Sequence, residues 1–358
     1  MPSRLKAGAS YSPLRTLVPT YWVPTVESDA DEIVIGAGTG MADALGRHSY
    51  VVNAGWATSR ARPDWNVGYA YDRWRPTLFA SYADDTDPVP GGEIRSRELF
   101  AGALLAFRRI RHSNTFLAGF DAETDTLTCE GGCGSRVTEG NLRSLRGGWL
   151  FDSRRRFGYS ISAEEGIALE VAAEASPASL GSDGDAGAAI ADLRGFTRIG
   201  SGHTVLAARA GVAGSWGDEG SRRVFSAGGP GPSYPVFDFG RETIALLRGF
   251  DPDDIVGTRA ASVNIDLRVP IARPQRGLGS WPVFLHSIHA AAFLDVGHAW
   301  DGGFHVGDVK SAVGGELSTD IVILHFVPLT FTGGAAWTHD GASGRQRGAV
   351  FARFGYAF

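Results

Sequence analysis

The chain has 358 residues, and its 34 Lys and Arg against 39 Asp and Glu give a formal net charge of −5, which excludes the basic surface typical of a nucleic-acid-binding protein. No apolar run reaches about 18 residues, so transmembrane helices are excluded as well. A transmembrane β-barrel is not excluded, because its strands alternate between apolar and polar residues and their average hydropathy resembles that of a soluble protein.

The N-terminal segment contains no apolar core of signal-peptide length. If the chain crosses a membrane, its export signal is therefore expected upstream. We expect residues 1–15 to be a linker that follows a missing upstream region, and residues 16–358 to form one outer-membrane β-barrel.

The segment Asp31–Tyr50 begins like a dinucleotide-binding strand and loop, with Gly36, Gly38 and Gly40 after a β-branched run. The dinucleotide fingerprint needs a further glycine that opens a helix, and Met41 occupies that position. Too few residues follow before the next β-rich run to form a crossover of a dozen or more residues. We therefore predict antiparallel strands here, and no cofactor.

Most of the chain consists of segments that alternate between apolar and polar residues with a period of two, as β-strands do. Sixteen such segments leave about 22 residues for each strand and its connection, a spacing typical of an outer-membrane barrel. The predicted strands are 20–27, 32–42, 48–58, 64–72, 75–83, 94–108, 112–125, 139–151, 157–172, 188–199, 201–216, 257–271, 284–299, 309–322, 325–338 and 347–358.

The connections between these strands alternate in length. Short links such as "RWRP" and "SRRRF" alternate with longer ones such as "DDTDPVPGGE" and "ETDTLTCEGGCGSRVTEG", as expected where short turns and long loops lie at opposite ends of a barrel. A large β-sandwich is the alternative fold, but it does not require this alternation. Six tryptophans lie mainly at strand ends, consistent with aromatic girdles: Trp56, Trp65, Trp74, Trp149, Trp300 and Trp337.

The sequence contains little that indicates metal or catalytic chemistry. Cys129 and Cys133 have no second pair and no nearby histidine, so we predict a small loop disulfide rather than a zinc site. His286 and His289 fall on opposite sides of a strand and cannot share a metal. The acidic stretches "GSDGDAG" and "DPDD" lack calcium-loop spacing, and no catalytic triad is recognisable. We predict no metal, no cofactor and no catalytic residue.

The most specific stretch is Leu247-Arg248-Gly249-Phe250, which resembles the Val/Leu-Arg-Gly-Phe/Tyr tip of the long sixth loop in bacterial surface antigen barrels. That superfamily includes BamA-type outer-membrane assembly factors and two-partner-secretion transporters. Further positions of the family pattern are matched by Gly257, Asn264, Asp266, Arg268, Pro270, Phe293, Asp295 and Gly297, and the chain ends on aromatic residues like a barrel terminal signal, namely Phe354, Tyr356 and Phe358. The resemblance covers essentially the whole chain.

The resemblance implies an all-β fold, a 16-stranded antiparallel transmembrane β-barrel whose long sixth extracellular loop folds inward. In such a barrel Arg248 at the loop tip would pair with Asp295, and Asp266 would be a neighbouring acid. Gly249 would permit a tight turn, and Phe250 would wedge the loop against the wall.

The parity of the strand at 284–299 agrees with that implication. Phe293, Asp295 and Gly297 share one side, whereas residues such as Leu294 and Val296 share the other. If the apolar set meets lipid, the carboxylate of Asp295 points into the lumen, where it needs a cation.

Other features modify or extend the family pattern. Arg353 stands five residues before the last aromatic residue, where the family has glycine, so the terminal signal is weaker. Pro19 and Pro24 remove ladder amides from the first strand and predict a weak seam between the first and last strands, unless residues 10–20 are merely a linker. The occurrence of "YWVP" near the start together with "YSISAEEG" resembles the sequences of barrels that follow Tol-type β-propellers in longer chains.

The function that the resemblance implies is assembly or insertion of outer-membrane proteins, or polypeptide translocation, in a bacterial outer membrane. The alternative is a passive outer-membrane anchor or pore that displays an upstream periplasmic domain. The expected partners are outer-membrane lipid, client outer-membrane or secreted polypeptides and that upstream periplasmic domain, without nucleic acid. We do not expect an enzyme, because the charged pair would hold a loop and no bond would be made or broken.

Overall fold

The computed structural model describes residues 11–29, 32–57, 62–89, 92–129, 140–200, 202–229, 243–277, 279–324, 327–355 and 358. Among the residues singled out in the sequence, Cys133, Tyr356 and most of the segment 1–15 lie outside this part of the chain.

Nearly all of the regular structure is β. One antiparallel sheet has 17 strands, of which β16 is only two residues long. Its strands are β1 (Val23–Asp29), β2 (Glu32–Ala42), β3 (His48–Ala57), β4 (Asp64–Tyr71), β5 (Thr77–Val89), β6 (Gly92–Arg108), β7 (Ser113–Cys129), β8 (Gly140–Asp152), β9 (Gly166–Ser176), β10 (Ala186–Ile199), β11 (Thr204–Gly217), β15 (Arg259–Ala272), β16 (Arg276–Gly277), β17 (Val283–Trp300), β18 (Lys310–Ile323), β19 (Val327–Asp340) and β20 (Gln346–Phe354).

A second, smaller sheet consists of β12 (Phe225–Ala227), β13 (Thr243–Ala245) and β14 (Ile255–Gly257). The helical elements are short 3-10 turns: η1 (Pro13–Arg15), η2 (Ala178–Leu180), η3 (Glu219–Ser221) and η4 (Val306–Asp308). Across the described ranges, no helix has the length and apolar character needed to span a membrane.

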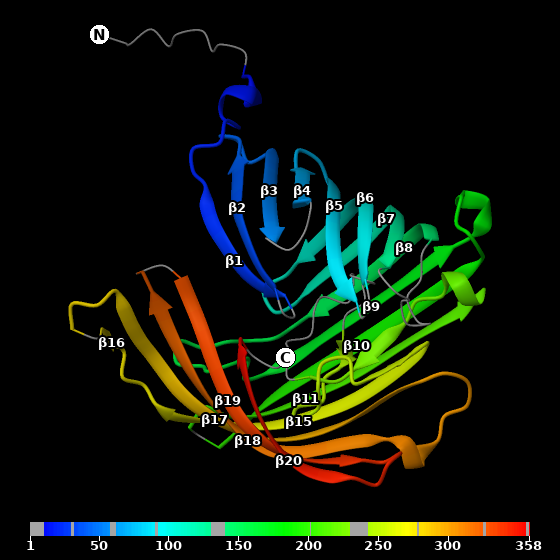
Figure 1. Ribbon diagram of the computed structural model, residues 1–358. Coiled ribbons are helices and arrows are strands. Elements are labelled where there is room, and N and C mark those ends of the chain that lie inside the picture. The colour runs from blue at the N-terminus through cyan, green and yellow to red at the C-terminus, as the bar shows by residue number, and fades with distance from the viewer. Residues whose placement is uncertain are drawn as a thin grey trace, which may run out of the picture. The chain divides into compact units, whose positions relative to one another are not determined.

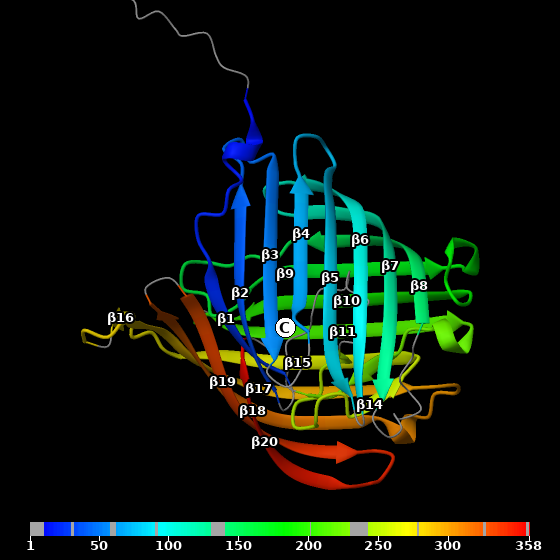
Figure 2. The ribbon, with the colours of Figure 1, turned by 45° about the horizontal axis from the view of Figure 1, so that its top comes forward.

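The chain divides into two compact units. Unit 1 comprises Met1–Leu105, Leu117–Leu145 and Ser176–Asp183, and unit 2 comprises Ala106–Phe116, Arg146–Ala175 and Gly184–Phe358. In unit 1 the strands from β1 to β5 each pair with the next strand in sequence, and the blue to cyan strands β2 to β5 lie side by side in Figure 2. The glycine-rich segment Glu32–Ala42 is therefore an antiparallel strand, as predicted.

Unit 2 contains the strands that position the candidate site. β10, β11, β15, β17, β18, β19 and β20 pair in this order and lie side by side from green to red in Figure 1. In the register of β15 with β17, Asn264 lies opposite Asp295 and Asp266 lies opposite Phe293. Side chains two residues apart on a strand share a face, so these polar side chains gather on one face of the sheet.

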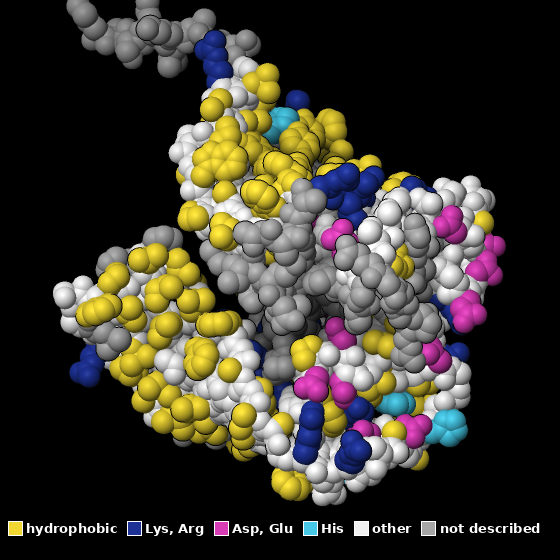
Figure 3. Space-filling view, in the orientation of Figure 1, with side chains coloured by type: hydrophobic (Ala, Val, Ile, Leu, Met, Phe, Trp, Pro, Cys, Tyr) yellow, Lys and Arg dark blue, Asp and Glu magenta, His cyan; other side chains and the backbone are white. Residues whose placement is uncertain are grey.

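The two faces of this sheet differ in polarity. Along β15, Ser262, Asn264, Asp266 and Arg268 are buried, whereas Val263, Ile265 and Leu267 are exposed. We call the face with the buried polar residues the covered face and the opposite one the open face. Figure 3 shows hydrophobic side chains gathered over β15 to β19, where Ile271, Trp281, Phe284, Leu317 and Phe331 are exposed. This pattern reverses the usual preference for apolar residues inside and polar residues outside.

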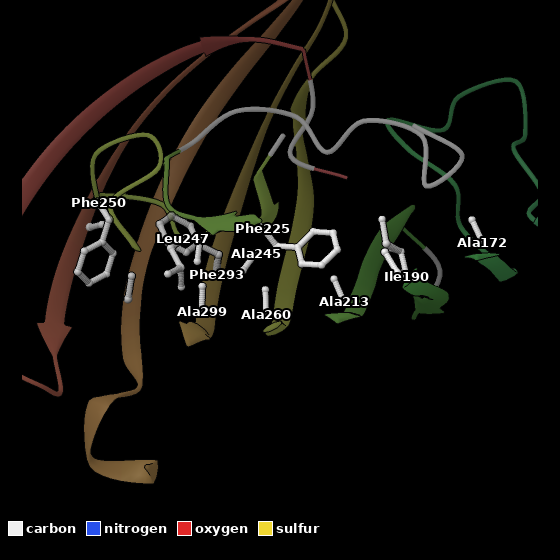
Figure 4. Packing of buried hydrophobic residues seen from close by; sticks show 14 residues of the cluster. Ala172, Ile190, Ala213, Phe225, Ala245, Leu247, Phe250, Ala260, Phe293 and Ala299 are labelled. Atoms are coloured by element: carbon white, nitrogen blue, oxygen red, sulfur yellow. The ribbon is translucent and has the colours of Figure 1, made fainter. Parts of the chain in front are cut away.

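The long loop, residues 218–258 between β11 and β15, carries β12, β13 and β14, and its described residues 218–229 and 243–258 pack on the covered face. Figure 4 shows the large loop side chains Phe225 and Leu247 close to the small strand side chains Ala260 and Ala299. The small alanine side chains let the loop backbone lie close to the sheet. Burial of each large apolar side chain contributes about 1.5–3 kcal/mol.

Most predicted strands are observed with small shifts at their ends, but the prediction of a strand over 157–172 was wrong in its first half. β9 begins only at Gly166, whose φ of +98° turns the chain into the strand. Ile161, Ser162, Ala163 and Glu164 are all buried, so this stretch does not alternate as a strand would. The connection between β15 and β17 contains the short strand β16, which pairs with β17.

Candidate functional site: a buried charge cluster beneath the long loop

Arg248 lies at the tip of the long loop, between β13 and β14, and its side chain is fully buried. Its guanidinium donates from Nε to Asp295 Oδ2 at 2.8 Å and from Nη2 to Asp295 Oδ1 at 2.7 Å. The same Nη2 donates to Asp266 Oδ1 at 2.6 Å, and the backbone amide of Arg248 donates to Asp295 Oδ2 at 3.0 Å. Bidentate, charge-assisted bonds of this kind are geometrically specific, so they tie the loop tip to one place on the sheet.

A neighbouring amide orients the carboxylate that receives the arginine. Asn264 Nδ2 donates to Asp295 Oδ1 at 2.8 Å and to the carbonyl oxygen of Leu246 at 2.8 Å. One side chain of β15 thus holds both the acid on β17 and the loop backbone beside Arg248.

Two glycines of the family pattern make room for the loop. Gly249 has a φ of +90°, a conformation that residues with a side chain rarely adopt. A Cβ at Gly297 would lie 3.3 Å from Leu247 Cδ2 and 3.4 Å from Ala245 Cβ. The absence of a side chain at Gly297 therefore lets the loop pack against β17.

Aromatic side chains complete the packing around the loop tip. The Cζ atom of Arg248 lies 3.8 Å from the ring centroid of Phe293, a cation–π contact. Phe250 is buried, and its ring centroid lies 5.1 Å from Lys310 Nζ. Lys310 is also ion-paired with Asp254, farther along the loop. The loop is therefore attached to β18 as well as to β15 and β17.

Arg268 connects the site with the C-terminal residue. It donates from Nη2 to Asp266 Oδ2 at 2.9 Å and to the carbonyl oxygen of Phe358 at 3.1 Å, and its Cζ lies 4.7 Å from the Phe358 ring centroid. Phe354 is exposed and packs on Phe331, with 5.8 Å between the ring centroids. The structure thus brings Phe358, but not Phe354, to the polar side chains beneath the loop.

Glu316 and Arg353 extend the site toward the last strand. Arg248 Nη1 lies 3.4 Å from Glu316 Oε2, and Arg353 Nη2 donates to Glu316 Oε1 at 2.8 Å. Arg353 Nε also donates to the carbonyl oxygen of Gly355 at 3.3 Å. The arginine that departs from the family's terminal pattern therefore belongs to the same network as the loop tip.

We define the charge cluster as Arg248, Arg268 and Arg353 with Asp266, Asp295 and Glu316. Its three cations and three anions balance, which is the condition under which buried charges are tolerated. Burial alone would lower the pKa of Arg248, but hydrogen bonds to Asp295 and the charges of Asp295 and Asp266 raise that pKa above its ordinary value. The guanidinium at the loop tip therefore stays charged.

A separate ion pair attaches the start of the long loop. Arg223 donates from Nε to Glu174 Oε1 at 2.6 Å, and Arg146 Nε lies 3.2 Å from Glu174 Oε2. Together with the charge cluster and the Lys310–Asp254 pair, this contact ties both described parts of the loop to the sheet.

The sequence-based reasoning missed Glu316, Lys310, Asp254, Arg223 and Glu174, and it identified Arg353 only as a departure from the terminal signal. A signal was present for Glu316 and Arg353, because each is a charged residue whose two neighbours along the strand lie on the open face. In the described residues, no group of three or more His, Cys, Asp or Glu side chains is arranged to hold a metal ion. Cys129 ends β7 and is disulfide-bonded, whereas Cys133 lies outside the described residues, so their pairing stays a prediction.

We expect Glu316 and Arg353 to be energetically coupled. In a double-mutant cycle of Glu316→Gln and Arg353→Gln, the two changes should couple by about 1–3 kcal/mol, because each single change leaves a buried charge unbalanced. Urea unfolding of the refolded protein measures the four free energies. The exposed pair Asp251 and Arg347, whose charged atoms lie 3.6 Å apart, is the control and should couple by less than about 1 kcal/mol. Additive effects at Glu316 and Arg353 would contradict the network.

Comparison with known proteins finds solved structures of similar fold, but no match by sequence. No family model and no curated protein matches the sequence. Among solved structures, the chain is similar to BamA from Haemophilus ducreyi lacking POTRA domains 1–3, with 14% identity and a TM-score of 0.61, over 95% of this chain and 76% of that chain. It is also similar to CdiB from Escherichia coli, with 12% identity and a TM-score of 0.54, over 90% of this chain and 59% of that one.

CdiB from Acinetobacter baumannii is likewise similar, with 12% identity and a TM-score of 0.56, over 93% of this chain and 58% of that one. The chain thus spans about three fifths of the length of each CdiB. At these identities the likeness establishes a shared fold.

Proposed function

We propose that the chain is an outer-membrane β-barrel, formed by residues 16–358, that assembles and inserts other outer-membrane proteins or passes polypeptides through the membrane. The single observation that carries this proposal is the buried charge cluster, which attaches a long loop to the covered face of a sheet with the fold of BamA and CdiB. A loop held by charges is stable in place, yet it can be released without breaking a covalent bond.

The polarity of the two faces supports a membrane location. The open face of β15 exposes Val263, Ile265 and Leu267, and lipid is the solvent in which such a surface is stable. The covered face has the buried charges, as expected of a barrel interior. The barrel would close around this face and the long loop.

In the proposed mechanism the loop occupies the interior until a client polypeptide arrives. The client would compete with the loop for the covered face, while the charge cluster sets the free energy needed to move the loop. The proposed partners are lipid and client polypeptides, together with a periplasmic domain, by analogy with a BamA that has POTRA domains.

The test is an insertion assay. The protein, refolded in liposomes, should accelerate the folding of an unrelated outer-membrane porin over empty liposomes, and the Arg248→Ala, Asp295→Ala double variant should lose this acceleration. The Asp251→Ala, Arg347→Ala double variant is a matched control, because it also removes one acid and one arginine, but from an exposed pair. We expect the control to retain the activity.

No acceleration by a correctly folded wild-type barrel would contradict the assembly function. A passive anchor or pore would then be the better interpretation. Acceleration that survives in the Arg248→Ala, Asp295→Ala variant would instead contradict the role of the loop.

A further inference from the structure

One end of the strands of unit 2 is rich in arginine. The segments 107–112, 152–165, 198–203 and 273–277 lie at the ends of successive strands, and we call them the basic turn edge. Their described residues include nine arginines but only the acids Asp152, Glu164 and Glu165: Arg108, Arg109, Arg111, Arg154, Arg155, Arg156, Arg198, Arg273 and Arg276. At the opposite end, the segments 251–254 and 301–308 contain five aspartates, although the arginines Arg259, Arg345 and Arg347 also lie there.

Contacts between neighbouring segments join the basic turn edge into one surface. The His112 ring stacks on Phe151 at the end of β8, with 5.9 Å between the ring centroids. Arg273 Nη2 donates to the carbonyl oxygen of Tyr159 at 3.0 Å, and the Cζ of Arg198 lies 5.8 Å from the Phe157 ring centroid. The arginines of these different turns therefore lie on one continuous surface.

The few acids of this edge are already occupied. Asp152 pairs with Arg154 at 2.7 Å, Glu165 lies 3.5 Å from Arg155, and Glu164 is buried beside His203. Many of the cations therefore have no acid of their own on this edge.

The β6–β7 turn shows the excess of cations most clearly. Arg108, Arg109 and Arg111 are exposed and make no ion pair with any described residue. Between them Ile110 is fully exposed. Guanidinium groups match the geometry of phosphate oxygens, so this turn presents three phosphate-binding groups around one apolar side chain.

A row of exposed aromatic residues lies directly behind this turn on the strands. Phe107 and Phe116 have ring centroids 6.2 Å apart, and Phe116 stacks on Trp149 with 6.5 Å between centroids. Aromatic side chains at this position are typical of the boundary between lipid and water.

We propose that the basic turn edge binds the phosphate headgroups of anionic phospholipids in the membrane leaflet that it faces. The aromatic row lies at the boundary between lipid and water, and the guanidinium groups of the turn, on the water side of this row, bind the phosphates. This inference rests on the proposed membrane location. Each arginine near an anionic surface strengthens lipid binding by roughly fivefold.

The experiment measures binding of phosphatidylglycerol to the refolded full chain by native mass spectrometry, with phosphatidylcholine as the reference lipid. The test variant is Arg108→Gln, Arg109→Gln, Arg111→Gln. The matched control is Arg259→Gln, Arg345→Gln, Arg347→Gln, which removes three exposed arginines from the opposite strand ends. We expect the test variant to lose roughly one hundredfold in phosphatidylglycerol affinity and the control to lose little. Replacement of the three turn arginines by lysine should retain most of the preference.

Three outcomes would overturn the inference. An equal loss of phosphatidylglycerol affinity in the test and control variants would indicate a general effect of net charge. A wild-type protein that bound phosphatidylglycerol no better than phosphatidylcholine would show that there is no such site. Competition by inorganic phosphate as effective as that by the lipid would indicate a soluble anion as the ligand. Failure of the proposed function is distinguishable, because a barrel that inserts in liposomes but does not accelerate porin folding can still prefer phosphatidylglycerol.

Discussion

Replacing Arg248 with methionine is expected to weaken attachment of the long loop by about 3–5 kcal/mol, because removal of one partner leaves buried acids without compensation. Asp266 and Asp295 are fully buried, and Arg248 donates to both of them. Methionine fills part of the same space without a charge, so the loss reports the electrostatic contacts more than the packing.

Hydrogen exchange of loop amides measures this change. The backbone amide of residue 248 donates to Asp295 Oδ2 on β17, so its exchange reports whether the loop is in place. Since each 1.4 kcal/mol corresponds to a factor of ten, exchange should accelerate by roughly a hundredfold to several thousandfold. Amides of β18 should be unaffected if the sheet stays intact.

Two further variants separate charge from geometry. Arg248→Met with Asp295→Asn removes both charges of the central pair and should recover part of the protection. Arg248→Lys should be intermediate, because an ammonium group cannot reproduce the fork that reaches both oxygens of Asp295. If Arg248→Met exchanged at the wild-type rate, the charge cluster would not be what holds the loop.

The strands were predictable from sequence because their side chains alternate locally. The segment 32–42 has the bounds of β2, and the polar and apolar sets of β15 lie on opposite faces as their parity indicates. Local pattern failed at 157–165, where consecutive buried residues fold beside the sheet, and at β12, β13 and β14. Strands of three residues are too short to show a period, and tertiary contacts decide them.

The candidate site was predictable only in part. Arg248, Asp266 and Asp295 came from the resemblance to a family, since no local rule pairs a loop residue with acids 18 and 47 positions away. Arg353 illustrates what remained hidden. Taken alone it is a departure from a terminal signal, and only the position of β20 beside β19 places it within reach of Glu316 on β18.

Gly249→Ala is expected to have the second large effect, about 2–5 kcal/mol, for two separate reasons. A φ of +90° costs a residue with a side chain roughly 1–2 kcal/mol. In addition, the new Cβ would lie 2.7 Å from Ala336 Cβ and 2.9 Å from Thr338 Cγ2, closer than such atoms approach, and crowding of this kind costs about 1–3 kcal/mol.

Gly344→Ala is the matched control for the first reason. Gly344 has a φ of +66° in the turn between β19 and β20, but nothing lies within 4 Å of its added Cβ. Urea unfolding should therefore show only the cost of the backbone conformation. Equal losses at Gly249 and Gly344 would contradict close packing of the loop tip against β19.

Ala336→Gly in the Gly249→Ala background tests the second reason directly. The substitution removes the atom nearest to the added Cβ, although a glycine within a strand itself costs roughly 0.5–1 kcal/mol. A double variant more stable than Gly249→Ala would therefore place the crowding between these two side chains. Because Ala336 is on β19, such a recovery would also show that the loop tip packs against this strand in solution. Release of the loop from the charge cluster would then require that the loop tip also separate from β19.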